Sequence, residues 1–180
     1  MLRICVLGAD CTGKTTICKQ LAQHFNGLYV PEFARTFLSG RIQQLQLADM
    51  VSIARGQIRL ESSICSANKE IAFCDGSPLA SIVWSRRYFG ACAKELVDIA
   101  ANHPYDKYLL CSIDLPWEPD GLRNSLRFRE WLERAFCTEM DQRNLPYATI
   151  SGVGSERLAC AISLLNIEFP QLRGHSSGGL

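Results

Sequence analysis

The feature that most constrains this chain is a short loop near its start, between an apolar run and a helix-like stretch. Residues 8–15 read Gly-Ala-Asp-Cys-Thr-Gly-Lys-Thr and directly follow the apolar run at residues 2–7. Glycines at this spacing ahead of Lys-Thr are typical of loops whose backbone N–H groups wrap phosphates, with a helix N-terminus directed at the anion. The pattern therefore predicts a strand, a phosphate-binding loop and a helix, in that order.

The residues of this loop have separate expected roles. Lys14 would reach the β- and γ-phosphates of a nucleotide triphosphate, and Thr15 would bind Mg²⁺ through its hydroxyl. Gly8 and Gly13 supply backbone freedom and close approach. The predicted phosphate-binding residues are Gly8, Ala9, Asp10, Cys11, Thr12, Gly13, Lys14, Thr15 and Thr16. We expect ATP and Mg²⁺ as cofactors.

Apolar runs and helical patterns alternate along the rest of the chain. The predicted strands are 2–7, 28–30, 71–74, 107–111 and 146–150, and the predicted helices are 13–25, 47–68, 78–88, 91–102 and 154–167, with a further helical piece opening at 31–35. This repetition predicts an α/β fold of the P-loop NTPase class, a three-layer sandwich with a mainly parallel five-stranded sheet. We expect one domain at 1–168 and a flexible tail at 169–180.

Composition narrows the classes of partner. The chain has 19 basic and 18 acidic residues, so no global charge would attract nucleic acid or an anionic membrane. Nine cysteines form no C-x-x-C pair and indicate buried thiols in a reducing cytosol, although Cys11 could have a lowered pKa near phosphates or be a passive loop residue. No apolar run approaches the roughly 20 residues that span a bilayer. We expect a soluble, cytoplasmic protein, and the oligomeric state stays open.

Acidic residues follow three of the predicted strands. Glu32, Asp75 and Asp114 each come just beyond a strand end. In a parallel sheet these ends meet at the edge that holds the phosphate loop, so the three carboxylates should converge there. Asp75 could hold Mg²⁺, directly or through water, or could instead cap the helix that begins near Ser77.

Glu32 and Arg35 lie one helical turn apart. Glu32 is placed to accept a proton or a hydrogen bond from the hydroxyl of an acceptor molecule. The alternative is a solvated ion pair between Glu32 and Arg35, with no role in chemistry. The residues alone do not decide between the two.

A proline-rich segment at 113–123 carries an aromatic residue and leads into several arginines. Trp117 could stack on a flat base or anchor the core. Arginines could close over phosphates as a lid at about 113–130, or lie on a solvated helix face with Glu130 and Glu133. The arginines concerned are Arg123, Arg127 and Arg129.

Several motifs together resemble a known family. They are the Gly8 loop, the run Val30 to Arg35, Asp75 after the third strand, Pro-Trp-x2-Asp-Gly-Leu-Arg at 116–123, and Gly152 with Glu156-Arg157. In this order they resemble nicotinamide riboside kinase domains, the kinase half of the bifunctional bacterial NAD-biosynthesis regulator and its stand-alone relatives, over residues 4 to about 162.

The resemblance implies ATP-dependent phosphorylation of a nucleoside 5′-hydroxyl, with nicotinamide riboside as the leading small-molecule acceptor. The implied catalytic residues are Lys14, Glu32, Asp75, Arg123 and Arg127; the implied acceptor-binding residues are Glu32, Arg35, Asp75, Trp117 and Asp120; Thr15 and Asp75 would hold the metal. The alternatives are a kinase for another nucleoside or nucleotide, and a P-loop ATPase or regulator that acts through a macromolecular partner.

The chain departs from the family pattern in two respects. It starts at the first strand, without the adenylyltransferase domain of the bifunctional relatives, so we expect neither dinucleotide synthesis nor DNA binding. Val153 stands where relatives often have an aromatic residue. If that aromatic encloses the pyridine ring, one wall is missing here, and Tyr88 or Phe89 could replace it.

Overall fold

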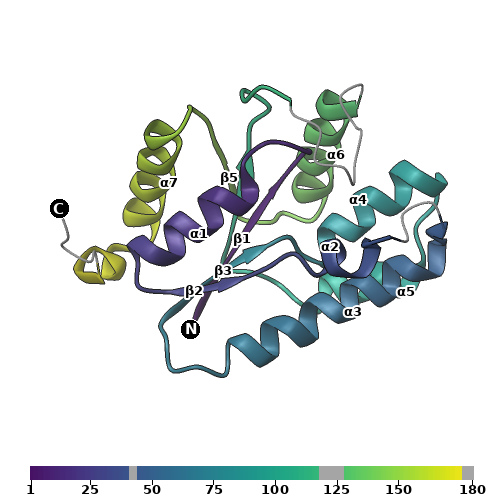
Figure 1. Cartoon of the computed structure of the whole chain (residues 1–180), viewed down its shortest axis with the longest axis horizontal. Coiled ribbons are helices and arrows are strands. Elements are labelled where there is room, and N and C mark those ends of the chain that lie inside the picture. Colours follow the sequence, from purple (N-terminus) through teal and green to yellow (C-terminus); the bar gives the residue numbers. More distant parts are fainter. Residues whose placement is uncertain (41–43, 118–127, 176–180) are drawn as a thin grey trace.

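A five-stranded, wholly parallel sheet forms the centre of the protein (Figure 1). The computed structural model describes residues 1–40, 44–117 and 128–175. The strands lie in the order β2-β3-β1-β4-β5. Their bounds are β1 Leu2–Gly8, β2 Leu28–Val30, β3 Ile71–Asp75, β4 Lys107–Cys111 and β5 Tyr147–Ile150. The predicted α/β fold with five parallel strands is confirmed.

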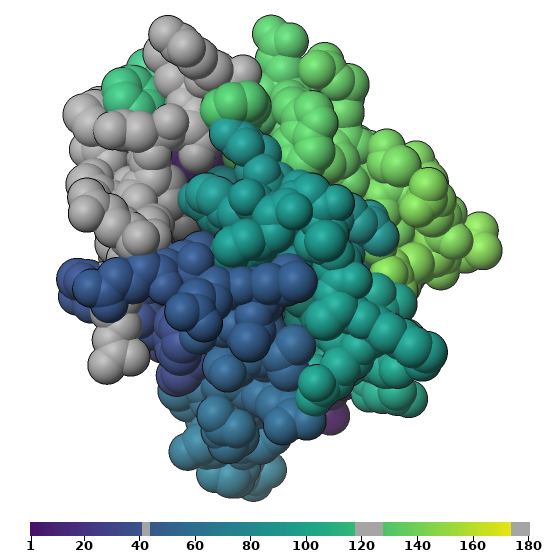
Figure 2. All heavy atoms as spheres, turned by 90° about the vertical axis from the view of Figure 1, so that its right-hand side faces the viewer, coloured from purple at the N-terminus to yellow at the C-terminus, as the bar shows by residue number. Residues whose placement is uncertain are grey.

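Helices cover both faces of the sheet (Figure 1). Their bounds are α1 Lys14–His24, α2 Phe33–Leu38, α3 Leu47–Ile64, α4 Pro78–Phe89, α5 Lys94–Ala101, α6 Arg129–Gln142, α7 Ser155–Glu168 and the 3₁₀ helix η3 Pro170–His175. Seen from the side, α3 in blue, α4 and α5 in teal and α6 in green make up one face of the molecule (Figure 2). None of the helices in the described ranges is long and apolar enough to cross a membrane.

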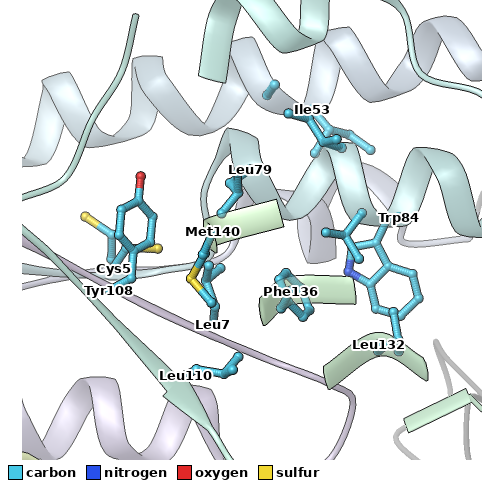
Figure 3. Close-up of a cluster of buried hydrophobic side chains, with 14 of the residues drawn as sticks. Cys5, Leu7, Ile53, Leu79, Trp84, Tyr108, Leu110, Leu132, Phe136 and Met140 are labelled. Carbon is cyan, nitrogen blue, oxygen red and sulfur yellow. The ribbon is translucent and has the colours of Figure 1, made fainter. Parts of the chain in front are cut away.

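Side chains of the central strand alternate between two cores. Cys5 and Leu7 of β1 pack with α3 to α6, in the cluster drawn in Figure 3. Ile4 and Val6 point to the other face and pack with α1 and α7. A strand that is buried on both faces reads as a continuous apolar run, which is the pattern that predicted β1.

Three predicted boundaries differ from the structure by three residues or more. Helix α3 ends at Ile64 rather than 68, where the Ser66 hydroxyl donates to the Ser63 carbonyl and a turn begins. Helix α5 begins at Lys94 rather than 91, because α4 ends at a left-handed Gly90 and a short extended segment follows. The packed chain also extends past residue 168, where we expected a tail, since Leu172 in η3 is buried against the α1 side of the sheet.

The strand order decides where the functional residues meet. β1 lies between β3 and β4, and β2 pairs with β3. The carboxyl ends of β1, β3 and β2 are therefore neighbours, and chain segments that leave them share one edge of the sheet. The phosphate loop follows β1, Glu32 follows β2, and Asp75 is the last residue of β3.

Candidate functional site

The phosphate loop joins β1 to α1 through an unusual backbone. Gly8 has a φ of 150°, Gly13 of 76° and Cys11 of 56°. A Cβ on Gly8 would lie 2.8 Å from the Thr12 hydroxyl and 2.9 Å from the Cys111 carbonyl oxygen, so no larger residue fits. The glycine spacing read from the sequence thus reflects both backbone conformation and close packing.

Two side chains fold back onto this loop. The ammonium of Lys14 donates to the Ala9 carbonyl over 2.7 Å, and the Thr12 hydroxyl donates to the same oxygen over 2.8 Å. Helix α1 begins at Lys14 with no acidic residue in its first turn and no side-chain cap. A buried lysine beside a helix N-terminus makes this loop an anion site.

Asp75 connects the loop to the neighbouring strand. It is the last residue of β3, and its Oδ2 accepts a hydrogen bond from the Thr15 hydroxyl over 2.5 Å. Helix α4 begins with Ser77 as its N-cap residue, so Asp75 does not cap it. Burial raises the pKa of Asp75 and the charge of nearby Glu32 raises it further, against the opposing effects of the Thr15 hydrogen bond and Lys14.

The same pair of residues fits a magnesium ion. Oδ1 of Asp75 is buried and has no hydrogen-bond partner within the described residues. The other carboxylate oxygen, Oδ2, accepts the hydrogen bond from the Thr15 hydroxyl. Carboxylate and hydroxyl oxygens are the ligands that Mg²⁺ takes in nucleotide sites, so this donor set suits the ion.

Glu32 lies at the start of α2, beside β3. It is the N-cap residue of α2, and its Cγ lies 3.5 Å from the position that a Cβ on Gly76 would take. Arg35 donates to Glu32 Oε2 over 3.1 Å, so the predicted ion pair forms. Because Glu32 is mostly buried and close to Asp75, the ion pair belongs to this edge of the sheet rather than to a solvated helix face.

A pocket opens beside Glu32, between α2, α3 and α4. Counting the open space at its mouth, the volume between the lining atoms is about 450 Å³. Its walls are largely apolar, and Trp84 and Tyr88 stack on each other with ring centroids 5.4 Å apart. The lining residues are Glu32, Ala34, Leu38, Met50, Ile53, Gln57, Gly76, Ser77, Ala80, Ser81, Trp84 and Tyr88.

Sequence reasoning missed most of this pocket. Glu32 was identified and Tyr88 was considered as a replacement wall, but the apolar residues of α3 and α4 read as ordinary core positions. Trp84 and Tyr88 are one helical turn apart on α4, which was the available signal.

Other predicted residues lie away from the pocket or outside the described ranges. Trp117 is half-buried, with a buried Nε1 that has no hydrogen-bond partner within the described part, and it does not line the pocket. The expectation of Arg129 on a solvated helix face is wrong, and its place in a lid stays a prediction. Arg129 is buried at the start of α6 and donates to the Leu115 carbonyl over 2.8 Å. Asp120, Arg123 and Arg127 lie outside the described residues.

Arg157 supports the phosphate loop through a hydrogen bond, a role that sequence reasoning missed. This buried side chain of α7 donates to the Thr12 carbonyl over 3.0 Å and to the Gly152 carbonyl over 2.9 Å, and it pairs with Asp114. Asp114, expected at the catalytic edge, therefore ties the segments after β4 and β5 together. The Glu156-Arg157 motif was the signal that could have identified this contact.

These features define the chain as a P-loop nucleotide-binding domain. Residues 3–157 match the family described as "AAA domain", and the chain belongs to that family. It is also 28% identical over 126 residues to the trifunctional NAD biosynthesis/regulator protein NadR of Salmonella typhimurium, which covers 67% of this chain and 30% of the relative. The chain thus spans less than a third of that relative's length.

Solved structures share the fold. NadR in complex with NR superimposes with a TM-score of 0.76 at 20% identity, covering 92% of this chain and 51% of that one. Thymidylate kinase from Ehrlichia chaffeensis superimposes with a TM-score of 0.67 at 14% identity, covering 91% of this chain and 98% of that one. The fold is therefore that of P-loop nucleoside and nucleotide kinases.

Proposed function

We propose that this protein is an ATP-dependent kinase that phosphorylates the 5′-hydroxyl of a nucleoside, with nicotinamide riboside as the leading acceptor. One observation carries the proposal. Glu32 lines an apolar pocket with an aromatic pair and lies beside Asp75, which accepts a hydrogen bond from Thr15 of the phosphate loop. The arrangement joins a phosphate site and an organic-molecule site through two carboxylates.

The phosphate loop supplies the donor side of the reaction. Its backbone and Lys14 bind the triphosphate, and the Lys14 ammonium neutralises charge that develops on the transferring phosphoryl group. Thr15 and Asp75 would hold Mg²⁺, which neutralises phosphate charge when bound. Arg157 keeps the loop in shape through the Thr12 carbonyl.

The pocket supplies the acceptor side. Glu32 accepts the proton of the attacking hydroxyl, or holds that hydroxyl by a hydrogen bond, and Arg35 orients the carboxylate. The apolar walls and the Trp84–Tyr88 pair receive the flat base. In this proposal Tyr88 takes the role of the aromatic that Val153 replaces. The predicted lid, with Trp117, Asp120, Arg123 and Arg127, would cover the acceptor and the phosphates.

Nicotinamide riboside is preferred because the NadR relative is described as an NAD biosynthesis protein and its structural counterpart was solved with NR. The test is ADP production from ATP and Mg²⁺ with a panel of nucleosides and nucleotides. We expect ADP formation to depend on one nucleoside and to yield its 5′-monophosphate. ADP production that no panel member stimulates would contradict the proposal and favour a P-loop ATPase or regulator.

A further inference from the structure

We propose that Gln57 is a positioning residue for the acceptor side of the site, and that it acts by holding the backbone next to Glu32. Gln57 lies on α3 and is buried. The functional part of this inference rests on the proposed kinase activity. The structural part does not, because it concerns the N-terminus of α2.

The first contact is a hydrogen bond from one helix to the start of another. Oε1 of Gln57 accepts the backbone N–H of Phe33 over 2.9 Å. Phe33 is the first residue of α2 and directly follows Glu32. The first N–H groups of a helix have no partner within the helix, and Glu32 makes no side-chain cap. Gln57 thus supplies, from outside α2, an acceptor for the N–H of its first residue.

The second contact fixes which way the Gln57 amide faces. Its Nε2 donates to Oε1 of Glu61 over 3.2 Å. If the amide were rotated by 180°, its NH₂ would face the Phe33 N–H and its oxygen would face the Glu61 carboxylate. In that orientation, two N–H donors would face each other at Phe33 and two oxygen acceptors would face each other at Glu61. The contact with Glu61 therefore keeps the Gln57 oxygen directed at Phe33.

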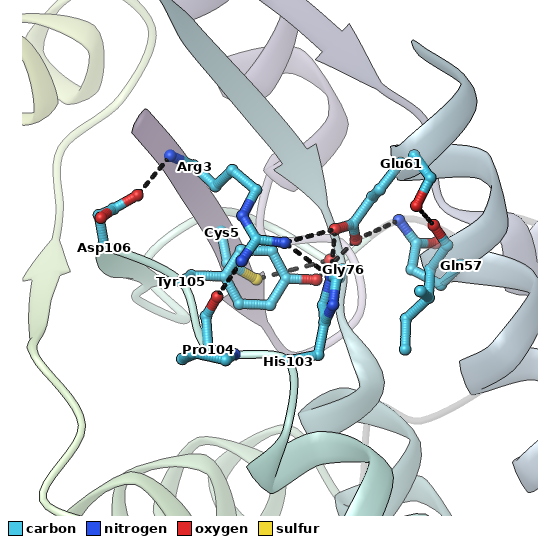
Figure 4. Close-up of polar contacts among 11 residues, drawn as sticks. Arg3, Cys5, Gln57, Glu61, Gly76, His103, Pro104, Tyr105 and Asp106 are labelled. Carbon is cyan, nitrogen blue, oxygen red and sulfur yellow. Dashed lines mark hydrogen bonds and ion pairs between the residues drawn. The ribbon is translucent and has the colours of Figure 1, made fainter. Parts of the chain in front are cut away.

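Glu61 is itself held by a buried polar cluster (Figure 4). Its oxygens accept the Tyr105 hydroxyl over 2.6 Å and contact His103 Nε2 over 2.7 Å, and Arg3 lies 4.0 Å away. Figure 4 shows the Glu61 carboxylate between Arg3 and Gln57. Residues of β1 and of the segment before β4 therefore anchor the amide that supports α2.

A third contact fixes the Phe33 side chain. Gly56 precedes Gln57, and a Cβ on Gly56 would lie 2.0 Å from Cε1 of Phe33. The ring thus packs directly on the backbone of α3, where only glycine leaves room. Neighbouring residues of α3 hold Phe33 in two ways, by its N–H and by its ring. The carboxylate of Glu32, one residue earlier, consequently has a restrained backbone.

The test uses Gln57→Met, which keeps the approximate volume and removes both hydrogen bonds. Gln142→Leu, at the exposed end of α6, is the control. Amide exchange measured by NMR should be at least about tenfold faster at Phe33 in Gln57→Met, and unchanged in the control. Unchanged protection of Phe33 in a folded Gln57→Met protein would overturn the inference, whatever the acceptor proves to be.

Steady-state kinetics test whether Gln57 acts on turnover through Glu32. Gln57→Met should lower acceptor turnover about tenfold to a hundredfold, as misplacement of a reacting group does, and leave the KM for ATP within about twofold. In a Glu32→Gln background the same substitution should have almost no further effect on turnover, because the group it positions is already lost. Equal losses in both backgrounds would show a merely structural role and refute the inference.

Gln57→Glu covers the case in which Gln57→Met does not fold. It keeps an oxygen that can accept the Phe33 N–H. Phe33 protection should then remain within about threefold of the original protein. Fast exchange at Phe33 despite this oxygen would count against the inference. If no nucleoside stimulates the original protein, the proposed kinase activity fails, while the exchange data still decide the role of Gln57.

Discussion

The phosphate loop and the proposed acceptor pocket lie side by side but are built in opposite ways. The loop is a continuous stretch between β1 and α1, shaped by the backbone of Gly8 and Gly13. The pocket is assembled from side chains of three helices, and the residue that follows its Glu32 donates its backbone N–H to Gln57 of α3. A loop formed by consecutive residues can be recognised from the sequence, whereas a pocket formed by side chains that are distant in the sequence cannot.

Lys14→Ala gives the largest expected effect. Loss of the ammonium removes the charge that stabilises the transferring phosphoryl group, so turnover should fall by about a thousandfold or more. The loop backbone should survive, because the Thr12 hydroxyl still bonds the Ala9 carbonyl. Steady-state ADP production and circular dichroism on one preparation test this. Near-normal turnover in the folded variant would exclude the kinase mechanism.

Glu32→Gln and Asp75→Asn should separate the two regions. Glu32→Gln should lower acceptor turnover about a hundredfold or more with little change in ATP affinity, because it removes only the proton acceptor. Asp75→Asn should instead raise the Mg²⁺ concentration needed for half-maximal rate. Rates across a magnesium titration distinguish the two. Matching losses confined to ATP affinity in both variants would contradict this division.

Tyr88→Ala should have a moderate effect on the acceptor alone. Loss of a stacking surface worth about 1–3 kcal/mol should raise the acceptor KM about tenfold, with ATP affinity nearly unchanged. Trp131→Ala, an exposed aromatic of α6 outside the pocket, is the matched control. If Trp117→Ala rather than Tyr88→Ala raises the acceptor KM, the base lies against the predicted lid and not against α4.

Asp75→Asn should also have a small effect on stability. Because burial raises its pKa, folded Asp75 binds a proton more readily than the unfolded chain does, and stability falls as pH rises from the ordinary pKa through the raised one. An asparagine avoids the buried charge, so the Tm at pH 7.5 should rise by about 2–4 °C, equivalent to about 1 kcal/mol. The difference should vanish below the ordinary pKa. Thermal melts at several pH values measure this, and a lower Tm for Asp75→Asn would contradict it.

The fold and the phosphate-loop side of the site could be predicted from the sequence. Alternating apolar runs predicted all five strands. The ends of parallel strands placed Asp75 at the phosphate loop, as its hydrogen bond with Thr15 confirms, and Glu32 lies beside Asp75. The pocket walls and Gln57 were not predictable, because their roles depend on how α2, α3 and α4 pack, which the local pattern does not encode. Arg129 was misread for the same reason, since its partner at Leu115 is a carbonyl that any residue provides.

The lining residues of the pocket all fall between Glu32 and Tyr88, after the phosphate loop and before β4. In the proposed kinase, the walls of the pocket are thus encoded in one uninterrupted segment of the gene, which follows the phosphate loop. A recombination event or a laboratory exchange that replaces this segment and keeps Asp75 would change these walls without altering the phosphate loop. The order of elements along the chain makes the pocket walls a separable, heritable unit.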